Sequence, residues 1–338
     1  MRYFLGVDVG NSKSHALIVN ETGHTAGYGE AGCGSPEVLG VDAMGEVLQG
    51  ITAQALELAG LNVDQVAGAG FGIAGYDWPT QTQPIREKIQ AALALQAPFG
   101  LVNDTLLGLL AGSSEGWGVA VVSGTGSNCW GLNRQGQTGR VTGEGWLFGE
   151  AGGGGDVVTC ALQAVSREWS KRGPATRLTQ AFLKHFGETD LDALFEGIVY
   201  GRYRLKPKDA IIVVQLAREG DGEAINVLAW NGRMLGDMAC GVIRQLHLEN
   251  EETEIVLIGS LYESGALLIE PMRQVITSLA PKARMVRLPS KPVVGAVVLG
   301  MQQVGLPTVD VRSTLIASTQ MINWQPTASL EEFNGQLN

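Results

Sequence analysis

The chain has 338 residues, a formal net charge of −10 and 45% hydrophobic residues. This length accommodates two domains with a core each, and the negative charge argues against a nucleic-acid or anionic-membrane partner. The four cysteines are widely spaced, which is typical of reduced thiols. Because the chain opens with a predicted strand and no apolar run approaches a membrane span, we expect a cytoplasmic protein.

Strands and helices alternate in the first part of the chain. The pattern predicts a three-strand meander followed by helix–strand units over Tyr3–Val9, Ser14–Asn20, Thr25–Gly29, Val41–Ala59, Val66–Ile73, Gln81–Leu95 and Phe99–Val102, with a helix from Thr105. Since this alternation requires crossover connections, the fold class is α/β with a largely parallel sheet.

The second part repeats this organisation and adds helices. A meander begins near Gly116 and is followed by a glycine-dense stretch, 143–155, and a helix-rich middle, 156–246. The alternation then returns, with predicted elements at Glu254–Ile258, Leu267–Leu279, Arg284–Leu288 and Val293–Val304. We expect domains at 1–113 and 114–305, and a tail, 306–338, of undetermined packing.

Two glycine-rich loops follow apolar strands about a hundred residues apart. Glycine allows backbone N–H groups to approach phosphate oxygens closely, and hydroxyl groups add further donors. The two loops also share a strand, loop, strand and tight-turn order, which indicates two related halves that face one cleft. The predicted phosphate-binding residues are Gly10, Asn11, Ser12, Lys13, Gly124, Thr125, Gly126 and Ser127.

Two aspartates stand at predicted strand ends. Asp104 follows a strand at a helix start, where a carboxylate could accept the proton of an attacking hydroxyl. The structural alternative is a helix N-cap. Asp8 could hold Mg²⁺ through a water molecule, or hydrogen-bond within its own turn.

Further residues could shape a ligand site. In the glycine-dense stretch, Trp146 and Glu150 favour a shaped loop, because a sugar presents an apolar face and a rim of hydroxyls. Gly75 lies in a turn after a strand and could line the same cleft. The alternative for 143–155 is an unstructured linker.

These motifs together resemble the actin-like ATPase superfamily. Within it, the chain is similar to the N-acetylglucosamine kinase and BadF/BadG/BcrA/BcrD ATPase family over about residues 3–300. The resemblance rests on five ordered segments: the loop from Asp8 to Ser14, Asn103-Asp104, the loop from Ser123 to Cys129, Val256–Ser260 and Pro292–Ala296. A sixth segment, 145–152, matches imperfectly.

The resemblance implies two ribonuclease-H-like domains with a central cleft for ATP, a helical insertion in the second domain, and often a homodimer. It implies adenosine contacts at Gly259 and Ser260, and sugar contacts at Ser35, Asp104, Asn128, Gly145, Trp146 and Glu150. Gly75 joins the expected sugar contacts through its place in the turn after a strand. Three positions depart from the family: Ser35 replaces an asparagine, Glu150 an aspartate and Ser260 a glycine. The first two bear on the sugar, and the third on the base pocket.

The predicted function is Mg²⁺- and ATP-dependent phosphorylation of a sugar hydroxyl, with N-acetylglucosamine or glucosamine as the expected substrate and Asp104 as the base. One alternative is a BadF-type ATPase that activates a redox enzyme through an iron–sulfur cluster shared by two subunits, although the expected cysteine signature is absent. Another is a regulator that binds sugar or nucleotide without turnover.

Overall fold

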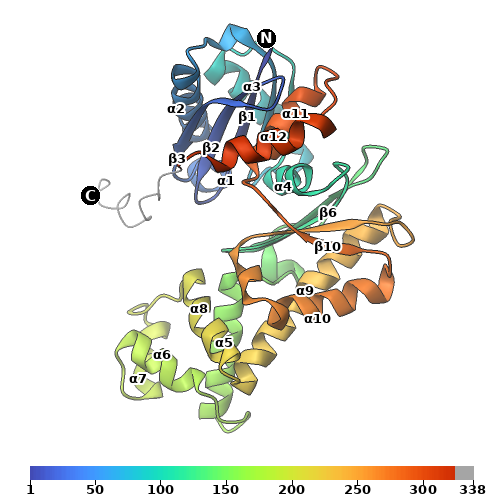
Figure 1. The fold of residues 1–338 in the computed structure, drawn as a ribbon. Helices are drawn as coiled ribbons and strands as arrows, with labels where there is room; N and C mark the ends of the chain where they lie inside the picture. Colours follow the sequence, from blue (N-terminus) through green and yellow to red (C-terminus); the bar gives the residue numbers. More distant parts are fainter. Residues whose placement is uncertain (324–338) are drawn as a thin grey trace. The chain divides into compact units, whose positions relative to one another are not determined.

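The computed structural model describes residues 1–323 and divides into two units, each built on a five-stranded sheet (Figure 1). Unit 1 comprises Met1–Gly118 and the chain from Val286 onward, and unit 2 comprises Val119–Met285. The predicted fold class, two ribonuclease-H-like α/β domains with a helical insertion in the second, is confirmed.

The sheet of unit 1 has the order β3-β2-β1-β4-β5. Antiparallel pairing joins β1, β2 and β3, and parallel pairing joins β1 to β4 and β4 to β5. The elements of this unit are β1 (Tyr3–Val9), β2 (Ser14–Asn20), β3 (Thr25–Ala31), α1 (Pro36–Leu39), α2 (Val41–Ala59), β4 (Val66–Ile73), α3 (Thr82–Leu93), β5 (Phe99–Asn103), α4 (Asp104–Gly112), α11 (Val293–Gln302) and α12 (Val309–Gln320).

The two faces of this sheet are packed differently. On one face, alternate residues of β1 such as Val7 join a core with Met44 and Ile51 of α2 and Ile89 of α3. Helices α4 and α11 cover the other face. Since successive side chains of a strand point to opposite faces, Asp8 lies on the face covered by α11.

Unit 2 repeats the strand order, β10-β9-β6-β7-β8, with a helical insertion between β8 and β9. Its elements are β6 (Gly118–Ser123), β7 (Ser127–Leu132), β8 (Thr138–Arg140), α5 (Gly154–Trp169), α6 (Leu178–Phe186), α7 (Leu191–Val199), α8 (Ala210–Arg218), α9 (Gly222–Gln245), β9 (Glu254–Ile258), α10 (Ala266–Leu279) and β10 (Arg284–Arg287). Helix α9 packs along α10 and against β7 and β8.

The C-terminal part of the chain departs from the predicted domain limits. The sequence places 114–305 in the second domain, whereas the structure groups the chain from Val286 with unit 1 and ends the first segment at Gly118. The physical reason is α11, an almost wholly buried helix that lies against β1 and β4. Glycines in these strands allow the close approach: a Cβ built on Gly70 would lie 2.1 Å from the carbonyl oxygen of Ala296.

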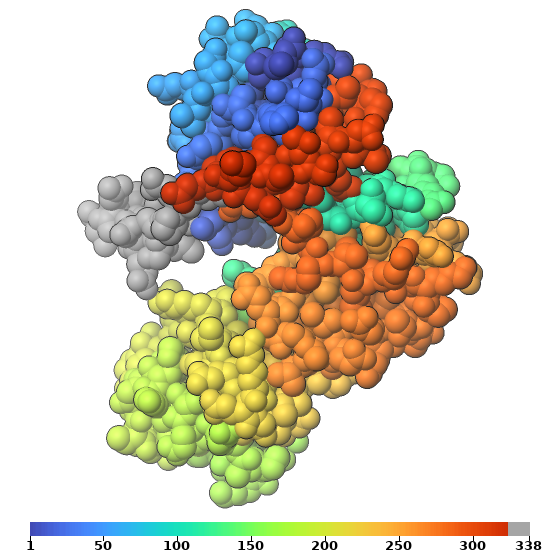
Figure 2. All heavy atoms as spheres, viewed as in Figure 1, coloured from blue at the N-terminus to red at the C-terminus, as the bar shows by residue number. Residues whose placement is uncertain are grey.

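The predicted tail, 306–338, is described as far as residue 323, and residues 324–338 lie outside the described part. Helix α12 packs against β3 and α11. The Ser318 hydroxyl lies 2.6 Å from that of Thr25, and Arg312 donates to the carbonyl oxygen of Leu110. Figure 2 shows the red atoms of this segment against the blue atoms of the N-terminal strands. The described part of the tail therefore belongs to unit 1.

No helix among residues 1–323 combines the length and the apolar character that crossing a membrane requires.

Candidate functional site

In unit 1, acidic residues meet where the parallel strands end. Strands β1, β4 and β5 run in the same direction, so Asp8, Asp77 and Asp104 come to one edge of the sheet. Asp8 is 8% exposed, and Asp104 is partly buried. This edge is where open α/β sheets bind their ligands.

Asp104 is the first residue of α4, and Asn103 is the N-cap. The Asn103 side-chain oxygen accepts a hydrogen bond from the Thr105 amide at 2.9 Å, and its amide donates to an Asp77 carboxylate oxygen at 3.1 Å. The capping role that the sequence left open for Asp104 therefore falls to Asn103. Burial, together with the negative charges of Asp8 and Asp77, raises the pKa of Asp104 to about 7.

A carboxyl group with a pKa near 7 is suited to general-base chemistry. At neutral pH it is ionised in about half of the molecules, and it takes a proton more readily than an ordinary aspartate does. Perturbed carboxyl groups of this kind cluster at functional sites.

The first glycine loop turns tightly after β1. The Gly10 amide donates to the Lys13 carbonyl oxygen at 3.0 Å, and the Gly34 amide donates to the Gly10 carbonyl oxygen at 3.1 Å. The side chains of Asn11, Ser12 and Lys13 are exposed. These predicted phosphate ligands are thus presented on a loop fixed at both ends.

Asp8 fits the role of an outer ligand to Mg²⁺. No cluster of three or more histidine, cysteine or acidic side chains within residues 1–323 could enclose a metal ion. Mg²⁺ keeps several waters and is commonly held by one or two carboxylates and by substrate phosphates. One buried carboxylate beside an exposed loop meets this requirement.

Ser35 does not lie where a ligand could reach it. Its side chain is fully buried, and its hydroxyl donates to the carbonyl oxygen of Ala74 at 3.0 Å. It fastens the loop after β3 to the turn that contains Gly75. The sequence predicts that Ser35 contacts the sugar directly. In this structure its side chain instead supports a neighbouring turn.

In unit 2, the second glycine loop lies against the N-terminus of α5. The amides of Gly154 and Gly155 donate to the carbonyl oxygens of Gly124 and Thr125 at 2.8 and 3.2 Å. A Cβ on Gly153 would lie 2.4 Å from the Gly126 carbonyl carbon, so this approach requires glycine. The structure brings Gly124–Ser127 together with part of the glycine-dense stretch, which is a shaped element and not a linker.

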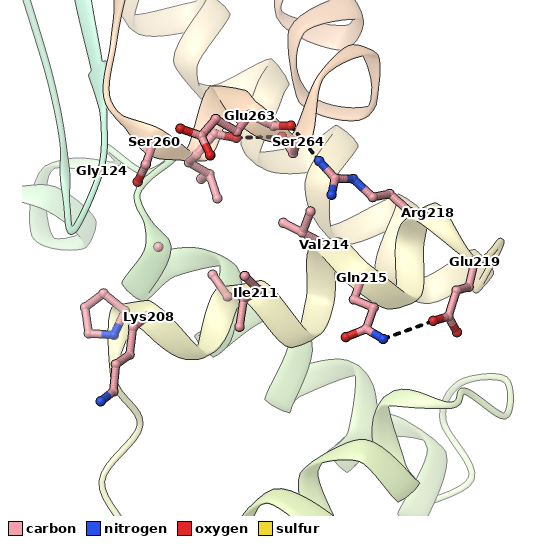
Figure 3. A pocket seen from close by; sticks show the side chains of 14 residues that line it. Gly124, Lys208, Ile211, Val214, Gln215, Arg218, Glu219, Ser260, Glu263 and Ser264 are labelled. Atoms are coloured by element: carbon pink, nitrogen blue, oxygen red, sulfur yellow. Dashed lines mark hydrogen bonds between the residues drawn. The ribbon is translucent and has the colours of Figure 1, made fainter.

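A pocket of about 680 Å³ adjoins this loop within unit 2 (Figure 3). Ile211 and Val214 of α8 form an apolar wall, and the segment Ser260–Ser264 faces them. Arg218 donates to the carbonyl oxygen of Glu263 at 2.7 Å. Gly259 packs on the loop, since a Cβ there would lie 2.2 Å from the Ser123 carbonyl oxygen. Of the predicted adenosine residues, Ser260 thus lines a cavity next to the predicted phosphate loop, and Gly259 packs on that loop.

Glu150 organises its own loop. The carboxylate accepts hydrogen bonds from the Thr142 amide at 2.7 Å, the Thr142 hydroxyl at 2.8 Å and the Gly143 amide at 2.8 Å. The residue is 6% exposed. The carboxylate is thus hydrogen-bonded within the loop. The sequence predicts instead that it accepts a hydrogen bond from a sugar hydroxyl.

This loop presents three large apolar side chains, Trp146, Leu147 and Phe148, two of which are aromatic. Trp146 is 50% exposed and stacks on Trp230 with ring centroids 5.5 Å apart. The Asn128 side chain lies beside Gly143, where a Cβ would be 3.2 Å from its amide nitrogen. Sugar contacts of Gly145, Trp146 and Asn128 remain predictions.

Three features of the candidate site were not predicted from the sequence: the apolar wall of α8, the start of α5 at Gly154, and the contact between His15 and Lys291. Only the structure shows that the apolar side chain of Ile211 is exposed, so no sequence signal indicated the wall. No local signal joins His15 to Lys291, whose side-chain nitrogens are 3.4 Å apart across 276 positions.

The chain is similar to named sugar kinases over most of its length. It is 24% identical over 305 residues to an N-acetylmuramic acid/N-acetylglucosamine kinase from Clostridium acetobutylicum, covering 90% of this chain and 99% of that protein. It is also 24% identical over 310 residues to an N-acetyl-D-glucosamine kinase from Dictyostelium discoideum, covering 88% and 97%.

Solved structures support the fold. A proposed N-acetylglucosamine kinase from Chromobacterium violaceum superposes with a TM-score of 0.66 at 22% identity, covering 88% of this chain and 99% of that one. A ROK family glucokinase from Streptomyces griseus, in complex with glucose and AMPPNP, gives 0.57 at 20% identity, covering 89% and 99%.

Residues 5–300 match the model of the BadF/BadG/BcrA/BcrD ATPase family. This match includes strands of both sheets, both glycine loops and most of α11, and the chain belongs to that family.

Proposed function

We propose that this protein transfers the γ-phosphoryl group of ATP to a hydroxyl group of an amino sugar, N-acetylglucosamine or glucosamine. The observation that carries the proposal is Asp104, a carboxyl group with a pKa of about 7 at the end of β5. The names of the two relatives from Clostridium acetobutylicum and Dictyostelium discoideum support the choice of sugar.

In the proposed reaction, the two units divide the work. The pocket of unit 2 binds adenosine, and its glycine loop offers backbone N–H groups to the phosphates. In unit 1, the Asp104 carboxylate accepts the proton of the sugar hydroxyl as that oxygen attacks the γ-phosphorus. Mg²⁺, held by Asp8 through water, would neutralise part of the phosphate charge.

The sugar would be held by residues that remain predictions. The exposed face of Trp146 can pack on the apolar face of a pyranose ring, and Gly145 and Asn128 lie in or beside the same loop. Glu150 would act by keeping this loop in shape. We also propose the homodimer that the family resemblance implies, and sedimentation of the full chain tests it.

A coupled assay of ADP release across hexoses, amino sugars and N-acetylated sugars tests the proposal. We expect release to require Mg²⁺ and to rise most with N-acetylglucosamine or glucosamine. A rate that no sugar changes would contradict the kinase function and favour the regulator or the activator ATPase.

The activator ATPase is the weaker candidate. Burial raises the pKa of Cys129 well above its usual range and that of Cys160 to about 11. Iron is bound by thiolates, and a raised pKa disfavours that form. Iron and acid-labile sulfide that copurify with the chain in stoichiometric amounts would reverse this order.

A further inference from the structure

A row of polar side chains crosses the sheet of unit 1 beside the first glycine loop. Asp8 of β1 pairs in register with His15 of β2, which pairs with Glu30 of β3. Directly paired residues of a sheet point to the same face. The row therefore lies on the face that α11 covers further along β1, since Gly6 of β1 contacts Val297.

Lys291 reaches this row from the other end of the chain. It stands two residues before α11, and its ammonium nitrogen lies 3.4 Å from Nε2 of His15. A lysine ammonium group can only donate, so Nε2 accepts and a neutral ring carries its proton on Nδ1. That nitrogen lies 3.9 Å from a carboxylate oxygen of Asp8. His15 thus lies between Lys291 and the predicted Mg²⁺ ligand.

Lys291 lies in surroundings of mixed charge that include a second ammonium group. Burial and the charge of Lys13 lower the pKa of Lys291, while Glu30 and Asp8 act in the opposite direction. The ammonium group of Lys13, on the loop that turns on Gly10, therefore acts electrostatically on that of Lys291. A phosphate group placed beside both would relieve their repulsion and accept hydrogen bonds from both.

We propose that Lys291 binds a phosphate group of ATP together with Lys13, and that His15 positions the Lys291 side chain over Asp8. This inference rests on the proposed function. It gives a phosphate-binding role to Lys291, which lies outside the sequence motifs. Lysine serves as a point charge for phosphate and stabilises the charge that spreads over the transferred group.

The test compares the dissociation constants of ATP and adenosine, measured by titration calorimetry with Mg²⁺ on the full chain. Lys291→Met should weaken ATP binding about tenfold or more and leave adenosine binding within about twofold, because adenosine has no phosphate. Lys291→Arg should restore most of the ATP affinity. Lys88→Met, which removes an ammonium that pairs with Asp42 on the surface of the same unit, is the matched control and should change neither constant.

A role for Lys291 in stability alone predicts a different result. In that case Lys291→Met lowers the melting temperature, leaves the ratio of the two dissociation constants at the wild-type value, and overturns the inference. Equal losses for ATP and adenosine, or a wild-type chain that does not bind ATP, also overturn it. A Lys291-dependent affinity for ATP without sugar-dependent ADP release would support the inference and contradict the proposed kinase.

Discussion

The two units share a strand order but offer different chemical groups at the ends of their strands. Unit 1 presents the carboxylates of Asp8, Asp77 and Asp104 around a loop with exposed side chains. Unit 2 presents backbone amides, a helix N-terminus at Gly154 and an apolar pocket. The shared scaffold therefore fixes where groups gather, and the residues at its loops decide which chemical groups each unit offers to a ligand.

The comparison makes Asp104 the most sensitive single position. Asp104→Asn preserves size but cannot accept a proton, so kcat should fall about 10²–10⁴-fold. The dissociation constant of ATP should stay near the wild-type value, because the phosphates would be held by the two glycine loops and Lys291 and not by Asp104. Steady-state kinetics and ATP titration measure both. A kcat within about threefold of wild type would exclude the role of base.

The acidic edge of unit 1 should also set the pH dependence. Only the ionised form of Asp104 can act as base, and its pKa is about 7. We expect kcat/KM to fall about tenfold for each pH unit below that value, and about 100-fold by pH 5. Initial rates at saturating ATP between pH 5 and 9 measure the profile. A profile that stays flat down to pH 5 would show that this carboxyl group does not limit the reaction.

Unit 1 alone depends on glycines that let α11 approach its sheet. In Gly70→Ala, the new methyl group would lie 2.1 Å from the Ala296 carbonyl oxygen, and we expect a loss of about 1–3 kcal/mol in the free energy of unfolding. Gly50→Ala is the control, because that site on α2 is exposed and has open space. It should gain roughly 0.4–1 kcal/mol. Urea denaturation measures both, and equal effects would contradict this account of the packing.

Substitutions in the pocket of unit 2 should weaken adenosine binding as well as ATP binding, whereas Lys291→Met should weaken only ATP binding. Val214→Glu places a charge on the apolar wall, so both ATP and adenosine should bind about tenfold more weakly. Val199→Glu makes the same change at a position of α7 that is 77% exposed, and it should leave both constants unchanged. Titration calorimetry separates the cases. Unchanged adenosine binding in Val214→Glu would show that the adenine ring binds outside this pocket.

The smallest expected effect is a gain in stability. Folding raises the pKa of Asp104 from 3.8 to about 7. Between these two pH values the folded chain keeps a proton that the unfolded chain has released, so the free energy of unfolding decreases as the pH rises through this range. Asp104→Asn has no such loss. Its melting temperature should exceed that of wild type by roughly 2–4 °C at pH 8, and the difference should shrink toward pH 5. A lower melting temperature at pH 8 would contradict the destabilising effect that burial and the neighbouring negative charges have on ionised Asp104.

Local patterns predicted most elements because each depends on neighbouring residues. The strands Val66–Ile73 and Glu254–Ile258 have the predicted limits, and the helix expected at Val41–Ala59 is α2. The sheet against which α11 packs could not be predicted from local patterns. An apolar helix is expected to be buried, but its partner depends on glycines such as Gly70, which lie more than two hundred positions away.

The sequence by itself determined the two glycine loops, the strand end that carries Asp104 and the repeat of the α/β pattern, because each is a short segment whose geometry follows from its own residues. The tertiary structure decided which groups are accessible and which are engaged. It buried Ser35 against Ala74, closed the Thr142–Gly143 segment around Glu150 and brought Lys291 to His15. Hydrogen bonds and burial join segments that are distant along the chain, so no local pattern contains them.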